Sequence, residues 1–157
     1  MKPGYLLAAA VFALDQLVKY WVTAIVGLRD RAVVGVFPGF DLTWVENRGV
    51  SMNLLRADTP AGRWLLVAAT LAIAVGVAVW IAREANRLDG IALGLVLGGA
   101  LGNIVDRVRF GYVVDFLHVW WRDHHFYVFN VADAAITVGV TLLLLRSVFG
   151  AAAAKPV

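Results

Sequence analysis

Four apolar stretches, each about as long as a membrane-spanning helix, occupy most of this chain. They run roughly over residues 5–26, 64–82, 90–105 and 129–148. A helix needs about 20 mostly apolar residues to cross a bilayer. Of the 157 residues, 61% are hydrophobic, against about 45–50% in a soluble domain. We therefore predict an all-α membrane protein with four transmembrane helices, forming a single domain over residues 1–157.

The same composition excludes several other classes of protein. The net charge of +3 is spread along the chain, whereas nucleic-acid binding requires a clustered basic patch, so no nucleic-acid partner is expected. The chain has no cysteine, which rules out thiol catalysis, disulfides and cysteine-based zinc sites. A cleavable signal peptide could explain the first apolar stretch, but Asp15 and Lys19 interrupt its core and the stretch is too long. We therefore predict that the first helix is retained.

Two long connections separate these helices. Between helices one and two, the segment 40–46 alternates loosely between apolar and polar residues, which predicts a short strand of a small β-sheet after a turn at Pro38-Gly39. Between helices three and four, residues 106–128 are rich in aromatic side chains. Such rings with polar edges settle at the membrane–water interface, so we predict an interfacial loop there.

The order of the helices fixes which parts of the chain share a side of the membrane. In a four-helix serpentine both long connections emerge on one side, and both termini and the turn at 83–89 emerge on the other. Lysines and arginines in short loops close to helix ends are the best indicator of the cytoplasmic side of a membrane protein. Here they weakly favour cytoplasmic termini. The charges alone do not settle the orientation.

Three of the four helices carry a stripe of polar residues at helical spacing. Residues three or four apart share a helix face, so each stripe can point inward. An ionisable residue at membrane depth costs roughly 2.5–3.5 kcal/mol on insertion scales, so these side chains indicate function. The stripes are Asp15, Lys19 and Thr23; Asn103, Asp106 and Arg107; and Asn130, Asp133, Thr137 and Thr141.

Structural explanations compete with functional ones for some of these residues. Asp15 and Lys19, four residues apart, could form a buried ion pair that fixes helix packing. Asp106 and Arg107 could be an interfacial anchor or a substrate contact, and both readings stay open. A GxxxG spacing lets helix backbones approach closely, so a packing role is predicted for Gly94, Gly98 and Gly102.

Asp115 and Asp133 are harder to explain as structure. They flank the second long connection, and both lie on the long-connection side. Two carboxyl groups that meet in a low-dielectric site cannot both ionise easily, so one keeps its proton. The charged one can then activate water while the other polarises a carbonyl, and the two titrate as a pair. Other catalytic patterns are weaker, because His124 and His125 point apart, His118 suits an interface, and no HExxH motif exists.

Five segments, taken in order, resemble the motifs of the lipoprotein signal peptidases (signal peptidase II). Each motif alone is weakly specific, but together they are very specific and cover nearly the whole chain. They are Leu14-Asp15-Gln16-Leu17-Val18-Lys19, Glu46-Asn47-Arg48-Gly49-Val50-Ser51, Gly98-Gly99-Ala100-Leu101-Gly102-Asn103-Ile104-Val105-Asp106-Arg107, Val113-Val114-Asp115-Phe116 and Phe129-Asn130-Val131-Ala132-Asp133.

The resemblance implies a multi-pass aspartic endopeptidase of the bacterial inner membrane, with its active site toward the periplasm and its termini cytoplasmic. It would cleave the signal peptide from diacylglyceryl-modified prolipoproteins just before the lipidated cysteine. A lipidated prolipoprotein and membrane lipid would be its partners, no metal or cofactor is expected, and we expect a monomer. The first connection would form a small periplasmic β-sheet that cradles the substrate, and the aromatic loop would be its lid.

The resemblance also assigns roles to residues of this chain. Asp115 and Asp133 would be the catalytic pair. Asp15 and Lys19 would support helix one, and Asp106 would brace the third motif. The residues expected to line the site and hold the substrate backbone are Asn47, Gly49, Asn103, Arg107 and Asn130.

The sequence departs from the family pattern at one place. After Asn47-x-Gly49 the family often has a phenylalanine and a small residue, whereas this chain has Met52 and Asn53. This difference bears on substrate preference.

Two other functions are alternatives to the peptidase. A small proton- or ion-coupled transporter could also use inward acidic residues, but we find neither broken nor repeated helices. A purely structural or partner-binding membrane protein is the third possibility.

Overall fold

Four long helices form the body of the protein in the computed structural model, which describes residues 2–50, 55–56 and 59–152. All four are long and apolar enough to cross a membrane, which confirms the predicted helices. Met52 and Asn53 lie outside the described residues. The helices are α1 (Pro3–Tyr20), continued by the π-helical turn η1 (Trp21–Ile25), α3 (Pro60–Arg83), α4 (Arg87–Phe110) and α5 (Val131–Ala152).

Local sequence signals explain where these helices begin. Proline occupies the first turn of both α1 and α3, where its missing N–H would be unpaired in any case. The Thr59 hydroxyl accepts a hydrogen bond from the backbone N–H of Gly62 (3.1 Å) at the start of α3. Asn86 caps α4 in the same way, accepting from the N–H of Leu88 (2.9 Å).

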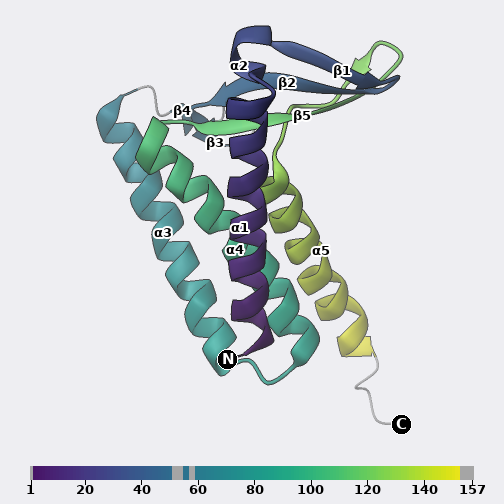
Figure 1. The fold of residues 1–157 in the computed structure, drawn as a ribbon. Helices are drawn as coiled ribbons and strands as arrows, with labels where there is room; N and C mark the ends of the chain where they lie inside the picture. The colour runs from purple at the N-terminus through teal and green to yellow at the C-terminus, as the bar shows by residue number, and fades with distance from the viewer. Residues whose placement is uncertain (1, 51–54, 57–58, 153–157) are drawn as a thin grey trace.

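A small antiparallel sheet lies across one end of the helices (Figure 1). Its strand order is β1-β2-β5-β6, with the short helix α2 (Leu28–Arg31) between η1 and β1. The N-terminus and the turn between α3 and α4 lie at the other end (Figure 1), as the serpentine topology predicts. The strands are β1 (Val33–Phe37), β2 (Phe40–Asn47), β5 (Val113–Trp121) and β6 (His124–His125), with a separate pair of β3 (Gly49–Val50) and β4 (Leu55–Arg56).

The second connection differs in detail from the interfacial loop that the sequence predicts. Helix α4 continues to Phe110, and β5 then pairs with β2 along most of its length. The first four residues of β5, from Val113 to Phe116, are all buried. A strand buried on both faces lacks the alternation of polar and apolar residues that marks a strand in a sequence, which is why the pattern did not reveal it.

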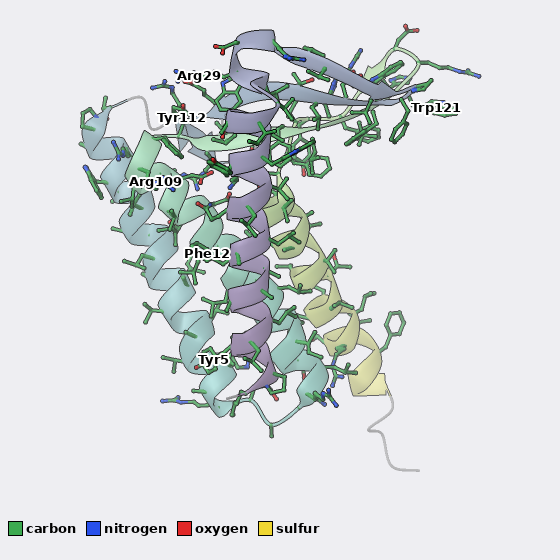
Figure 2. All side chains as sticks on the ribbon, in the orientation of Figure 1. Tyr5, Phe12, Arg29, Arg109, Tyr112 and Trp121 are labelled. Carbon is green, nitrogen blue, oxygen red and sulfur yellow. The ribbon has the colours of Figure 1, made fainter. Side chains whose placement is uncertain are left out.

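Side chains are distributed in the opposite way to those of a soluble protein. Large apolar side chains point outward along the helices, with Leu65 72% and Leu17 66% exposed, while Asp15 and Asn130 are 0% exposed. Figure 2 shows side chains projecting outward from the helices all along the bundle. Extended apolar surface of this kind needs lipid to cover it, so the chain is a multi-pass membrane protein.

Glycines on α4 allow α1 to pack closely against it, as the GxxxG spacing predicts. A methyl group at Gly98 would lie 2.5 Å from the carbonyl oxygen of Ala8, and one at Gly102 would lie 2.5 Å from an Asp15 carboxylate oxygen. Gly94 meets the backbone of Gly4 in the same way. Close approach of the two backbones brings the polar stripe of α1 against that of α4.

This packing predicts that Gly98→Ala destabilises the protein by about 1–3 kcal/mol, because the added methyl group forces α1 away from α4. Gly76→Ala on α3 is the matched control, since nothing lies within 4 Å of the added methyl group there. That substitution should be neutral or stabilising by about 0.5–1 kcal/mol. Thermal unfolding in detergent measures both changes, and equal midpoints for the two variants would contradict the packing described here.

Candidate active site

Asp115 lies near the start of β5, held by two asparagine side chains. The amide of Asn47, at the end of β2, donates to its Oδ2 (2.9 Å), and the amide of Asn130 donates to its Oδ1 (2.6 Å). Asp115 is 2% exposed. A buried carboxyl group is costly unless its oxygens are hydrogen-bonded, and here both oxygens have a donor.

Asp133 lies in the first turn of α5 and receives a hydrogen bond from the Asn103 amide on α4 (2.7 Å). Asn130 caps this helix, because its Oδ1 accepts from the backbone N–H of Asp133 (2.9 Å). The Asn130 amide also donates to Asn103 Oδ1 (3.2 Å). Two asparagines therefore connect the two carboxyl groups, which come from different elements of the fold.

Arg107 joins the same group from the next turn of α4. It is 9% exposed, and its Nη2 donates to the carbonyl of Gly49 in β3 (2.9 Å). The Gly49 N–H in turn donates to Asn47 Oδ1 (3.1 Å). Arg107 therefore contacts the Asn47–Gly49 segment instead of anchoring the helix at the interface. Its Nε is buried without a hydrogen-bond partner among the described residues.

Beneath this group lies a buried cluster of charges centred on Lys19. Its ammonium is 2.8 Å from Asp15 Oδ2 and 2.7 Å from Asp106 Oδ2. All three residues are buried. The ion pair that the i,i+4 spacing predicts is present, and Asp106 of α4 extends it to a triad. Gln16 also contacts this triad, because its side-chain amide donates a hydrogen bond to Asp106 Oδ1 (3.1 Å).

The two carboxylates of this triad also hold the backbone beside Asp115 and Asp133. Asp15 Oδ1 accepts from the N–H of Ala132 (3.0 Å), and Asp106 Oδ2 accepts from the N–H of Val114 (3.2 Å). Each amide belongs to the residue immediately before one of the two aspartates. The triad is thus connected by one hydrogen bond to the start of β5 and by another to the start of α5.

The pKa of Asp115 is raised to about 7, first because the group is buried and second because Asp133 is negatively charged nearby. Hydrogen bonds from Asn47 and Asn130 and the positive charge of Lys19 act in the opposite direction without cancelling the rise. A carboxyl group with a pKa near neutrality can hold or release a proton at working pH. This property suits acid–base chemistry.

The threonines of the polar stripes do not join the site. The Thr23 hydroxyl donates to the carbonyl of Lys19 (2.8 Å), and the exposed Thr137 hydroxyl donates to the carbonyl of Asp133 (2.8 Å). Each satisfies a carbonyl of its own helix, and because Thr137 is exposed, the inward position predicted for it is wrong. Gln16 was missed as a contributor, although it stands beside Asp15 in the first motif.

Comparisons with known proteins show which family and which fold this chain resembles. Residues 7–149 match the family described as Signal peptidase (SPase) II. A lipoprotein signal peptidase of Rhizorhabdus wittichii is 54% identical, covering 92% of this chain and 84% of that protein. One of Sphingopyxis alaskensis is 48% identical, covering 98% and 92%. A solved bacterial membrane enzyme superposes with a TM-score of 0.85 at 27% identity, covering 98% of this chain and 92% of that one.

The fold and these matches define a membrane-spanning aspartic peptidase. Family membership favours this class over the transporter and the purely structural protein. The chain belongs to the signal peptidase II family, whose members remove signal peptides from prolipoproteins.

The charge triad predicts that Lys19→Met lowers the free energy of unfolding by about 3–5 kcal/mol, because it leaves two buried carboxylates without their cation. Arg29→Met is the matched control: it removes an exposed arginine that lies 3.6 Å from Glu46. An exposed pair contributes at most about 1 kcal/mol. Denaturation of the detergent-solubilised protein compares the two, and similar losses would show that the buried triad has no special role in stability.

Proposed function

We propose that Asp115 and Asp133 are the catalytic pair of this peptidase. They would hydrolyse the peptide bond before the lipidated cysteine of a diacylglyceryl-modified prolipoprotein, and so release its signal peptide. The observation that carries the proposal is the placement of the two carboxyl groups. They come from β5 and α5, are joined through the amides of Asn130 and Asn103, and lie where the sheet meets the helix ends.

The chemistry requires one proton shared between the two carboxyl groups. The ionised carboxylate takes a proton from a water molecule, whose oxygen attacks the scissile carbonyl carbon. The protonated carboxyl group donates its proton to the carbonyl oxygen as that oxygen becomes tetrahedral. Collapse of the intermediate breaks the C–N bond, and a proton passes to the leaving amine. The raised pKa of Asp115 favours the singly protonated state of the pair near neutral pH.

Five neighbouring residues would bind the substrate backbone. Arg107 has a buried Nε–H group without a partner among the described residues, and a peptide carbonyl would satisfy it. Asn130 and Asn103 already orient the carboxyl groups, and their amides lie close to where a peptide would pass. Asn47 and Gly49 bring an extended segment alongside, suited to contact the substrate backbone. Asp15, Lys19 and Asp106 would support the site from below.

The position of the site suits a substrate that arrives through the bilayer. Both the lipid anchor and the signal helix of a prolipoprotein lie in the membrane, so lateral entry between the helices would bring the scissile bond to the sheet. We place this end of the protein toward the periplasm of the bacterial inner membrane, with cytoplasmic termini. The chain would act as a monomer and a single domain, because one chain supplies every residue of the proposed site.

Asp115→Asn and Asp133→Asn are each expected to abolish cleavage of a lipidated prolipoprotein, because an amide can neither take nor share the required proton. Asp30→Asn in α2 is the control, since Asp30 is exposed and lies outside the site. A gel-shift assay in detergent, with lipidated and unlipidated substrate, measures the cleavage. Unchanged thermal unfolding shows that each variant is folded. Full activity in a folded variant at either aspartate would exclude the proposed pair.

The pH dependence follows from the raised pKa of Asp115. Below about pH 7 the carboxyl group carries its proton, and above it both members of the pair become ionised. The value of kcat/KM should therefore fall as pH rises through about 7. Initial rates over a pH series with subsaturating substrate test this. Activity that keeps increasing well above that range would contradict a pair that needs its shared proton.

A further inference from the structure

A second polar cluster lies on the sheet, away from the aspartate pair. It consists of Asp41 and Thr43 of β2, His118 and Trp120 of β5, and His125 of β6. Asp41 is directly opposite His118, and Trp120 is directly opposite His125, so these four share one face of the sheet. Successive side chains of a strand alternate between faces, which places His118 on the opposite face from Asp115. The proposed hydrolysis uses none of the five.

The two histidines of this cluster meet through their ring nitrogens. His118 Nε2 and His125 Nδ1 are 3.2 Å apart. Two imidazole nitrogens that bind one Zn²⁺ at about 2.0–2.1 Å in tetrahedral geometry are about 3.3 Å from each other. The spacing therefore already matches the separation that a chelated metal ion imposes. The two rings are nearly parallel, with an interplanar angle of 12°, so both would have to rotate to turn their lone pairs toward a shared ion.

The surroundings of His118 prepare its Nε2 atom for this role. Its Nδ1 atom faces Asp41 Oδ2 at 3.7 Å and the Thr43 hydroxyl at 3.5 Å. Asp41 is itself held by a hydrogen bond from Trp120 Nε1 (2.7 Å). A carboxylate beside one imidazole nitrogen favours the tautomer with its proton there, which leaves the lone pair of the other nitrogen available to a metal ion.

We propose that His118 Nε2 and His125 Nδ1 together bind one divalent transition-metal ion of the Cu²⁺ or Zn²⁺ class. Imidazole ligands suit these ions, and Cu²⁺ binds tightest in the usual order. The described residues contain no group of three or more potential ligands, so water fills the remaining positions. Without metal, the same two nitrogens form an N–H···N hydrogen bond.

The metal site would link β5, which carries Asp115, to β6, which precedes α5. His118 lies three residues after Asp115, and His125 lies five residues before Asn130. A metal ion held between them closes a ring across the β5–β6 hairpin. Binding to the folded state alone raises apparent stability, so the ion should also raise the midpoint of thermal unfolding.

His124 provides a matched control within the same hairpin. It is exposed like His125, but it is the neighbouring residue of β6 and therefore points to the other face of the sheet. It lies directly opposite Trp121 instead of Trp120. Replacing it removes one imidazole from the chain without removing a proposed ligand.

The test is Cu²⁺ titration of the untagged protein in detergent, followed by electron paramagnetic resonance. We expect one Cu²⁺ ion per chain with two imidazole nitrogens coordinated, and displacement of that ion only by a large excess of Zn²⁺, because Cu²⁺ binds more tightly. His118→Gln and His125→Ala should each abolish this signal, and His124→Ala should keep it. Asp41→Asn should weaken the affinity about tenfold or more. Thermal unfolding should shift upward with Zn²⁺ in the wild type and in His124→Ala only.

Three results would overturn the proposal: no saturable binding to the wild type, a signal that persists in His125→Ala, or equal losses in His124→Ala and His125→Ala. Because His125 is exposed, its replacement tests the site even if His118→Gln fails to fold.

Discussion

The rest of the structure depends on the ion pairs that the buried ammonium of Lys19 forms with two carboxylates. A charge inside a low-dielectric protein is tolerated only when opposite charges compensate it, and Asp15 and Asp106 lie 2.8 and 2.7 Å away. The same two carboxylates accept the backbone amides of Ala132 and Val114. One cation therefore ties α1 and α4 to the segments that begin α5 and β5. Through these two hydrogen bonds the triad holds the backbone next to Asp115 and next to Asp133.

The sequence predicted most of this fold and not all of it, for identifiable reasons. The four helices were predictable because membrane-spanning helices need long apolar stretches, and the glycine spacing on α4 correctly indicated contact with a neighbouring helix. Strand β5 was not predictable, because Val113 to Phe116 are buried on both faces and do not alternate. The i,i+4 spacing revealed the partnership of Asp15 with Lys19 but could not show Asp106, which comes from a different helix.

Side-chain partnerships across the fold were the least predictable part of the site. The motifs indicated Asn103 and Asn130, but not that these amides join Asp115 to Asp133. Thr23 matched its stripe equally well, yet a hydroxyl can satisfy a carbonyl of its own helix. His124 and His125 are adjacent and suggested no common site. Only the pairing of β5 with β6 brings His125 to His118.

The shared-proton mechanism is tested most directly by a structure of the protein bound to an uncleavable substrate analogue. The analogue would be a lipidated peptide in which a hydroxyl-bearing carbon replaces the scissile carbonyl. We predict that this hydroxyl lies within about 2.5–3.0 Å of a carboxyl oxygen of both Asp115 and Asp133, as expected for a mimic of the tetrahedral intermediate. A hydroxyl that contacts only one of them, or neither, would contradict the shared-proton mechanism.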